Sequence, residues 1–247
     1  MQLARYTLGG RLVKNILACA ALLAPGIAAA SDDIPTGRLT VDSTLVRVGS
    51  SSQLDWSINY PSPVTQLINK DKKGTCTTKK KVRMQIRVLA AAFSNNTTYR
   101  EVTGYVVVNG SQTQIFKGIQ PDVKTNKIVY DKVLAAGSVI NVTGVTWDYT
   151  YNSRGQATGT KTMTSSTAAG DHSIVALYNG EALPEHEASA YPNMQLNALD
   201  YIANYMNRDN TAKIGDNQVI FLGDFNGFGN TGYDLNDFVI LVTFTAA

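Results

Sequence analysis

The sequence predicts an all-β protein, an immunoglobulin-like or jelly-roll-like β-sandwich with one helical excursion at about residues 194–206. Three observations lead to this fold class. Apolar and polar residues alternate with period two over many short segments. Turn-forming pairs such as Asn109-Gly110 and Asn179-Gly180 separate these segments, and helical periodicity stands out in only one place.

The clearest alternation places Leu54, Trp56 and Ile58 on one face of a strand, and residues 82–88 repeat the pattern. In such a strand one face meets the core and the other meets water. The predicted strands are Arg38–Val48, Gln53–Ile58, Val82–Val88, Val102–Val108, Gln112–Phe116, Lys127–Val133, Val139–Thr150, Thr158–Thr164, Ser173–Tyr178, Val219–Leu222 and Phe238–Phe244.

The longest predicted strand, Val139–Thr150, has an imperfect pattern. Asn141 and Thr143 interrupt the face that carries most of its large apolar side chains. The apolar residues of that face are Val139, Val145, Trp147 and Tyr149, and the interruptions make this strand a weaker prediction than the others.

The predicted helix covers Met194–Met206. Pro192 and Asn193 provide a start and the polar run at 207–210 provides a stop. Its apolar residues follow helical spacing and are Leu196, Leu199, Ile202, Tyr205 and Met206.

Residues 1–30 have the character of a secretory signal peptide. Arg5, Arg11 and Lys14 form a basic start, an apolar run of about a dozen residues follows, and Ala28-Ala29-Ala30 fits a cleavage site. We therefore expect a secreted, periplasmic or cell-surface protein with no membrane span after signal removal. One cysteine then remains, so the core depends on apolar burial rather than on disulfides.

Charge divides the remaining chain into two regions. Residues 31–170, the predicted basic β-sandwich domain, hold 17 basic and 9 acidic residues, a net charge of +8. Residues 171–247, an acidic β region with the one helix, hold 2 basic and 10 acidic residues, a net charge of −8. The acidic region is either a separate unit or part of the same domain. Opposite charges also favour self-association between copies of the chain.

Two stretches resemble known families. Val41–Tyr60, VDSTLVRVGSSSQLDWSINY, resembles the first strands of bacterial immunoglobulin-like domains. The C-terminal GDFNGFGNTGYDLNDFVILVTF resembles the end of a family of exported bacterial domains of unknown function, in which a Gly-rich loop and a D-x-[DN]-[DN] run precede the last strand. That resemblance implies an accessory or surface protein that binds calcium through its acidic run, here Asp234, Asn236 and Asp237.

The residues themselves also suggest a calcium site. Carboxylate and amide oxygens are the ligands that Ca²⁺ prefers, and the neighbouring glycines allow the backbone to wrap an ion. An EF-hand is excluded, since Phe228 occupies the fifth loop position and the twelfth is not Glu. A polar turn without an ion is the alternative. The candidate ligands are Asp224, Asn226, Asp234, Asn236 and Asp237.

A basic run at residues 70–87 is the candidate surface for an anionic polysaccharide or surface glycan. Aromatic residues do not interleave with it, so we expect no specific nucleic acid binding. A solvated loop and strand face is the simpler interpretation. The basic residues are Lys70, Lys72, Lys73, Lys79, Lys80, Lys81, Arg83 and Arg87.

The sequence contains little that predicts catalysis. Cys76 lies among lysines that would favour its thiolate, but its Gly74–Thr78 context is typical of a mobile loop tip and no His lies near it in sequence. We therefore expect a non-enzymatic, calcium-stabilised structural or adhesive protein that self-assembles. The alternatives are a carbohydrate-binding module that uses Trp147, Tyr149 and Tyr151, and an extracellular hydrolase.

Overall fold

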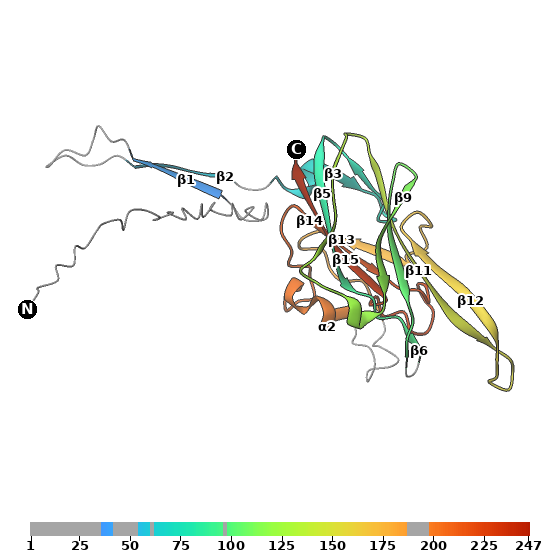
Figure 1. Ribbon diagram of the computed structural model, residues 1–247. Coiled ribbons are helices and arrows are strands. Elements are labelled where there is room, and N and C mark those ends of the chain that lie inside the picture. The colour runs from blue at the N-terminus through green and yellow to red at the C-terminus, as the bar shows by residue number, and fades with distance from the viewer. Residues whose placement is uncertain (1–35, 42–53, 60–61, 96–97, 187–197) are drawn as a thin grey trace, which may run out of the picture. The chain divides into compact units, whose positions relative to one another are not determined.

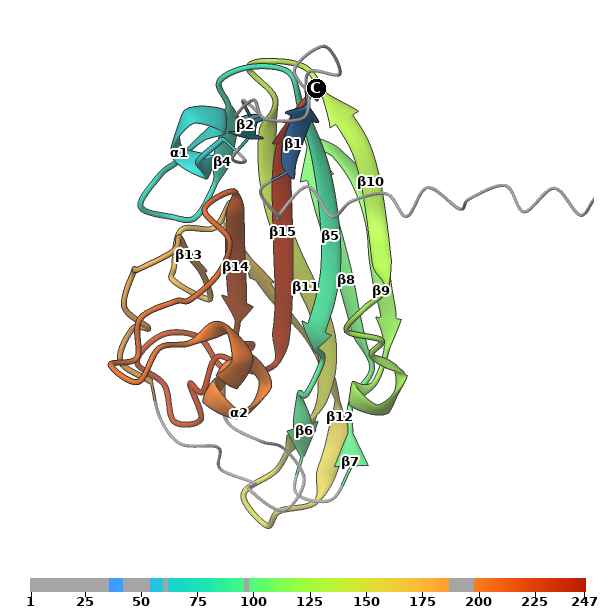
Figure 2. The same ribbon diagram turned by 90° about the vertical axis from the view of Figure 1, so that its left-hand side faces the viewer.

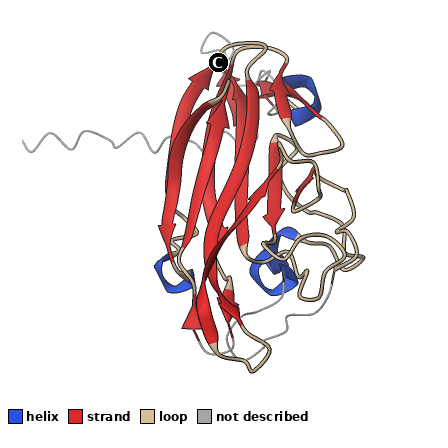
Figure 3. Ribbon diagram, turned by 90° about the vertical axis from the view of Figure 1, so that its right-hand side faces the viewer, coloured by secondary structure: helices blue, strands red, loops and turns tan. Residues whose placement is uncertain are grey.

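The structure is a computed structural model that describes residues 36–41, 54–59, 62–95, 98–186 and 198–247. Two antiparallel sheets dominate it, and the few helices are short (Figures 1 and 3). No helix within these ranges has the length and apolar character needed to cross a membrane. The predicted signal peptide lies outside the described residues.

One sheet has five strands in the order β10-β5-β15-β14-β13. Every neighbouring pair in it is antiparallel. The C-terminal strand β15 lies at the centre, between β5 from the basic region and β14 from the acidic region, so both regions contribute to one sheet. The strands are β5 (Val82–Ala90), β10 (Ile128–Leu134), β13 (Ile174–Leu177), β14 (Gln218–Gly223) and β15 (Phe238–Ala246).

The second sheet has six strands. Its path is β3-β4-β11-β8-β9, and β12 pairs with β11 as well. The distal half of β11 extends past its ladder with β8 and continues with β12 as a two-stranded ribbon. The strands are β3 (Ile68–Lys70), β4 (Cys76–Thr78), β8 (Val102–Val108), β9 (Ser111–Gly118), β11 (Val139–Tyr151) and β12 (Ala157–Ser166).

The main core lies between the two sheets, and the alternation of the strands supplies it. Every second residue of β5 points inward, and so do alternate residues of β14 and β15. This packing confirms the predicted all-β sandwich. The inward side chains from the five-stranded sheet include Val82, Met84, Ile86, Val219, Phe221, Ile240, Val242 and Phe244, which meet Cys76, Val102, Val106, Ile140 and Val142 of the other sheet.

A second apolar cluster covers the outer face of the five-stranded sheet. Ile220, Leu222 and Leu241 point into it, and Ile202 of helix α2 (Ala198–Ile202) packs against them (Figure 2). Because both faces are covered, every residue of β14 is buried. This explains why the two C-terminal strands have continuous apolar runs instead of alternation.

The predicted helix Met194–Met206 corresponds, within the described residues, to α2, which ends at Ile202, earlier than predicted. α2 is followed directly by a 3₁₀ turn at Ala203–Tyr205, and residues 194–197 lie outside the described residues. Short elements that the sequence analysis did not predict are β3, β4, α1 (Val64–Leu67), β6 (Ser94–Asn95), β7 (Thr98–Tyr99) and a 3₁₀ turn at Gln120–Asp122. Near the N-terminus, β1 (Thr36–Val41) and β2 (Leu54–Asn59) form an antiparallel pair.

The core face of strand β11 is not the face that carries its large aromatic side chains. Ile140 and Val142 are buried between the sheets, whereas Trp147 and Tyr149 lie on the outside. Asn141 and Thr143 therefore do not interrupt a core face. They belong to the outer face, where their polar side chains need no apolar partner.

Cys76 also differs from the expectation. It begins strand β4 and is fully buried, so the loop-tip interpretation was wrong. Burial raises the pKa of its thiol to about 12, and the nearby Lys70 ammonium opposes this effect only in part. A buried thiol with a raised pKa is inert, which leaves Cys76 as a small apolar core residue.

Two glycines on neighbouring strands make room for aromatic rings from the β14–β15 region. Gly104 of β8 is paired with Gly144 of β11. A Cβ atom at Gly104 would lie 2.1 Å from Cζ of Phe238, and one at Gly144 would lie 3.0 Å from Cζ of Phe225. The sheets can approach here only because these positions lack side chains.

We expect Gly104→Ala to lower the free energy of unfolding by about 1–3 kcal/mol, because the added methyl group forces the Phe238 ring out of its site. Urea unfolding of the purified variant measures this. Gly159→Ala is the control, since its Cβ would meet only Oγ1 of Thr150, at 3.3 Å. Equal stability of the two variants would contradict the close packing of Phe238 on β8.

Candidate functional site

The loop between β14 and β15 contains the acidic residues that the sequence analysis selected. The two strands pair in register up to Gly223 and Phe238. Asp224 and Asp237 are the next residues on either side, so the sheet itself places them across from each other. The intervening loop brings Asp234 next to this pair.

The three carboxylates form a compact buried cluster. One carboxylate oxygen from each of Asp224, Asp234 and Asp237 lies within 4.8 Å of the others. The side chains are buried, with exposed fractions of 0%, 1% and 1%. Carboxylates this close and this dry cannot all remain ionised without a compensating positive charge.

Asp224 organises the loop through its side chain. Its Oδ1 accepts hydrogen bonds from the backbone N–H groups of Asn226 at 2.7 Å and Gly227 at 3.1 Å. Its Oδ2 accepts from the N–H groups of Asp234 at 2.8 Å and Leu235 at 3.3 Å. One carboxylate therefore ties together both ends of the loop, which is also how a polar turn without an ion would hold itself.

The backbone around the cluster has an unusual conformation at Leu235. This residue has φ = 59°, the left-handed region, and its side chain is fully buried in the outer apolar cluster. A left-handed non-glycine residue costs about 1–2 kcal/mol. Burial of the leucine side chain offsets this cost, and the bend brings the N–H groups of residues 234 and 235 together onto Asp224.

The electrostatics of the cluster favour the neutral state of at least one carboxyl group. Burial, together with the charges of Asp224 and Asp234, raises the pKa of Asp237 well above its usual value. The backbone N–H of Phe225, which donates to Oδ2 of Asp237 at 2.7 Å, opposes this shift. Burial also raises the pKa of Asp224, against its four N–H donors. Either a proton or a cation can neutralise such a cluster, so it can hold a metal ion.

The two candidate amide ligands have different surroundings from the three aspartates. Asn226 braces the loop, because its Nδ2 donates to the carbonyl of Gly232 at 3.0 Å and its own carbonyl accepts from Asn230. Asn236 is fully buried between Asp234 and Asp237 in sequence. The structure thus brings the three carboxylates together and uses Asn226 to support the loop around them.

The aromatic residues of β11 form an exposed row on the ribbon. Trp147, Tyr149 and Tyr151 have exposed fractions of 36%, 36% and 51%. Neighbouring rings meet edge to face, with centroids 5.4 and 6.3 Å apart. The guanidinium of Arg100 lies 4.8 Å from the centroids of both Trp147 and Tyr149. Arg100 covers part of these two rings, and Tyr151 is the most exposed of the three.

The basic run does not form one surface. Lys70 makes an ion pair with Glu181, Lys79 donates to the carbonyl of Thr65, and Arg83 pairs with Asp131 of the neighbouring strand β10. Lys80 and Lys81 lie exposed between β4 and β5, and Arg87 lies further along β5. Lys70, Lys72 and Lys73 line a common pocket.

Sequence reasoning missed Arg100, and it interpreted His172 as a surface or turn residue rather than as part of a pocket. Arg100 gave no pattern, because the strands that bring it over β11 are far apart in the sequence. His172 lines the same pocket as Lys72 and Lys73 and has φ = 60°. Its neighbour Gly170 and the Asp-His-Ser sequence are typical of a turn, which is the one signal that the sequence carried.

Comparisons of the chain with protein-family models, with curated proteins and with solved structures give no match. The site must therefore be interpreted from its own geometry.

In a chelator, we expect the wild type to lose stability as pH rises above about 4. A carboxyl group whose pKa is raised on folding stabilises the native state below its unfolded pKa, and this contribution is lost as pH rises through the folded pKa. Asp237→Asn keeps the acceptor for the N–H of Phe225 but cannot ionise. Its stability relative to wild type should therefore increase by up to ~1.4 kcal/mol per pH unit. Urea unfolding from pH 4.5 to 8 measures this.

Asp209→Asn is the matched control. Asp209 is exposed, and hydrogen bonds from Thr211 lower the pKa of its carboxyl. A carboxyl group with a lowered pKa stabilises the native state, and this stabilisation is lost as pH falls. The stability of Asp209→Asn relative to wild type should therefore not increase at high pH. If the two variants follow the same pH profile, the buried cluster does not set the pH dependence.

Proposed function

We propose that this chain is an exported, non-enzymatic structural or adhesive protein, a β-sandwich in which a calcium ion fixes the loop between the two central C-terminal strands. The observation that carries this proposal is the buried cluster of Asp224, Asp234 and Asp237. Its three carboxylates lie at the end of the ladder between β14 and β15, where an ion would hold the most buried part of the sandwich together.

The donor set favours calcium over other common cations. Its ligand atoms are carboxylate oxygens, which suit hard cations, whereas zinc sites are rich in nitrogen and sulfur. Ca²⁺ accepts irregular sets of six to eight oxygens, including backbone carbonyls and water. Mg²⁺ requires near-ideal octahedral geometry and gives up its water reluctantly. A cluster shaped by loop hydrogen bonds therefore suits Ca²⁺ better.

A stabilising role agrees with the surroundings of the cluster better than a catalytic one. The three aspartates are buried, so a substrate would have to displace the loop to reach them. Cys76, the one thiol of the expected mature chain, is buried with a raised pKa. Association between copies through the oppositely charged regions belongs to the same proposal, and it would suit a surface protein that assembles.

We expect millimolar calcium to raise the melting temperature of the wild type by about 5–10 °C. Binding to the native state contributes RT ln(1 + [Ca²⁺]/Kd), or ~2.7 kcal/mol at a hundredfold excess over Kd. For a domain of this size each kcal/mol shifts Tm by ~2–4 °C. Magnesium should give a smaller shift. Thermal melts in chelator, calcium and magnesium measure the difference.

The variants Asp234→Asn and Asp237→Asn should lose most of the calcium-dependent gain while remaining folded in chelator. Asp209→Asn removes the same charge from an exposed site and should keep the full gain. Superimposable wild-type curves with and without calcium would mean that backbone hydrogen bonds alone hold the loop. The metal part of the proposal would then be wrong.

Carbohydrate binding is the second candidate function, and the exposed aromatic row on β11 favours it. A purely structural strand would be expected to bury such rings, yet Tyr151 is 51% exposed. Thr160 and Thr162 stand opposite Tyr149 and Trp147 on β12, so hydroxyl groups border the rings. This arrangement offers a sugar both a stacking surface and hydrogen-bonding groups.

If the row binds glycans, Tyr151→Ala and Trp147→Ala should each weaken binding about 2–10-fold, the loss expected for one aromatic contact. Affinity electrophoresis of residues 31–247 in gels that contain neutral polysaccharides measures this. Ile128→Ala removes an exposed apolar side chain from β10, at 48% exposure, and should change nothing. Unchanged mobility of the wild type in every polysaccharide gel would eliminate this candidate.

A further inference from the structure

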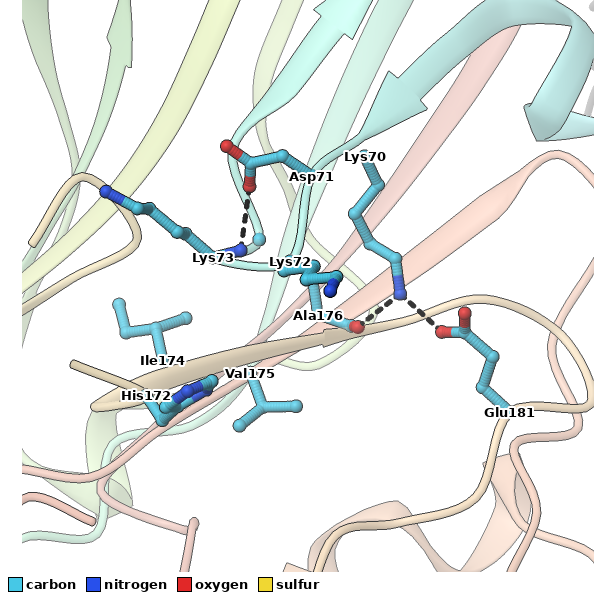
Figure 4. A pocket seen from close by; sticks show the side chains of 10 residues that line it. Lys70, Asp71, Lys72, Lys73, His172, Ile174, Val175, Ala176 and Glu181 are labelled. Carbon is cyan, nitrogen blue, oxygen red and sulfur yellow. Dashed lines mark hydrogen bonds and ion pairs between the residues drawn. The ribbon is translucent and has the colours of Figure 1, made fainter. Parts of the chain in front are cut away.

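A pocket of about 270 Å³ lies where the turn between β3 and β4 meets strand β13 (Figure 4). β3 and β13 are the last strands of their sheets, so the pocket opens at one edge of the sandwich. Lys70, Lys72 and Lys73 line one side, and the other side is lined by His172, Ile174, Val175 and Ala176.

Lys70 closes the edge of β13. Its Nζ donates to the carbonyl of Ala176 at 2.8 Å, makes an ion pair with Glu181 and lies 4.4 Å from the centroid of the Tyr178 ring. An edge strand with its carbonyl occupied in this way is protected against pairing with another strand. The same contact neutralises Glu181, one of the two carboxylates that line the pocket.

The other lining carboxylate belongs to Asp71, and the turn uses it. Its Oδ1 accepts hydrogen bonds from the N–H groups of Lys73 at 2.8 Å and Thr75 at 2.9 Å, and Gly74 completes the turn with φ = 90°. The turn therefore presents Lys72 and Lys73 to solvent at the mouth of the pocket. Neither lysine takes part in an ion pair within the described residues.

The far wall of the pocket adds hydrogen-bond donors. The carbonyl of Ala176 points outward to Lys70. In an antiparallel edge strand the N–H and C=O of one residue point to the same side, so the N–H groups of Ala176 and Ile174 also face outward. His172 stands before this strand with its ring exposed. Ammonium groups, edge N–H groups and an imidazole together make a site for an anion.

We propose that this pocket binds a carboxylate or sulfate group of an acidic saccharide, with Lys72, Lys73 and the outward N–H groups of β13 as its donors. A volume of about 270 Å³ is enough for one sugar residue, and the open mouth lets a polymer continue past it. The inference deepens the proposed surface role by naming a ligand class. It is independent of the calcium cluster and of the aromatic row.

The test is titration calorimetry of residues 31–247 with four probes. An alginate tetrasaccharide supplies four carboxylates on a sugar chain, glucuronate supplies one, inorganic sulfate is the free anion, and cellotetraose is the neutral saccharide. We expect the alginate tetrasaccharide to bind best and cellotetraose not to bind at this pocket. Equal affinity for sulfate and alginate would overturn the assignment to a saccharide.

Two lysine pairs separate the pocket from general attraction to the basic run. Lys72→Gln/Lys73→Gln should weaken alginate binding at least tenfold, and His172→Asn, which tolerates the left-handed backbone, should weaken it severalfold. Lys80→Gln/Lys81→Gln removes the same charge outside the pocket and should change affinity less than twofold. Equal losses in both pairs, or no loss in the first, would overturn the proposal. So would the absence of binding by every anionic probe.

These outcomes are distinct from those that test the surface role itself. A protein that binds alginate equally well with and without Lys72 and Lys73 still binds a glycan, so only the pocket assignment fails. Two other results would support the proposed function whether or not the pocket holds an anion. They are a calcium-dependent rise in melting temperature and binding of a neutral polysaccharide that Tyr151→Ala abolishes.

Discussion

Burial of β14 and β15 on both faces is the constraint on which the rest of the structure depends. A strand that is covered on both sides must be followed by a turn that begins in a dry environment, where each polar group needs a partner. Asp224 begins that turn and Asp237 ends it. The backbone N–H groups of the loop satisfy Asp224, but they cannot remove the repulsion among three carboxylates. Burial of both sheet faces therefore explains why the carboxylates at the end of these two strands are themselves buried.

The same constraint explains the long excursion after β13. The outer face of the five-stranded sheet is too apolar to meet water, and the segment that includes α2 and Ile214 covers it. Tyr233 and Leu235 of the acidic loop belong to this cover as well. Side chains that seal the sheet are thus adjacent in sequence to Asp234. The packing of these residues on the outer face of the sheet and the geometry of the carboxylate cluster are therefore coupled.

The sequence was sufficient to predict the sandwich and most of its strands, because period-two alternation reports directly on a half-buried sheet. It misplaced the core face of β11, since Trp147 and Tyr149 dominate the apolar count although they point outward. It missed β3 and β4, whose three residues each are too few to show a period. The sequence analysis placed the three aspartates together on the basis of their residue type and their shared loop, and the structure brings them together. The hydrogen bonds of Asp224 and the bend at Leu235 depend on three-dimensional packing and leave no periodic trace.

The central place of β15 has a mechanical consequence. Its hydrogen bonds to β5 and β14 run perpendicular to the strand, so a pull along β15 loads both ladders in shear. In shear the bonds must break together, whereas an edge strand such as β12, paired on one side only, can be peeled away one bond at a time. Tension along β15 would therefore meet more resistance than a force that peels β12 away from β11.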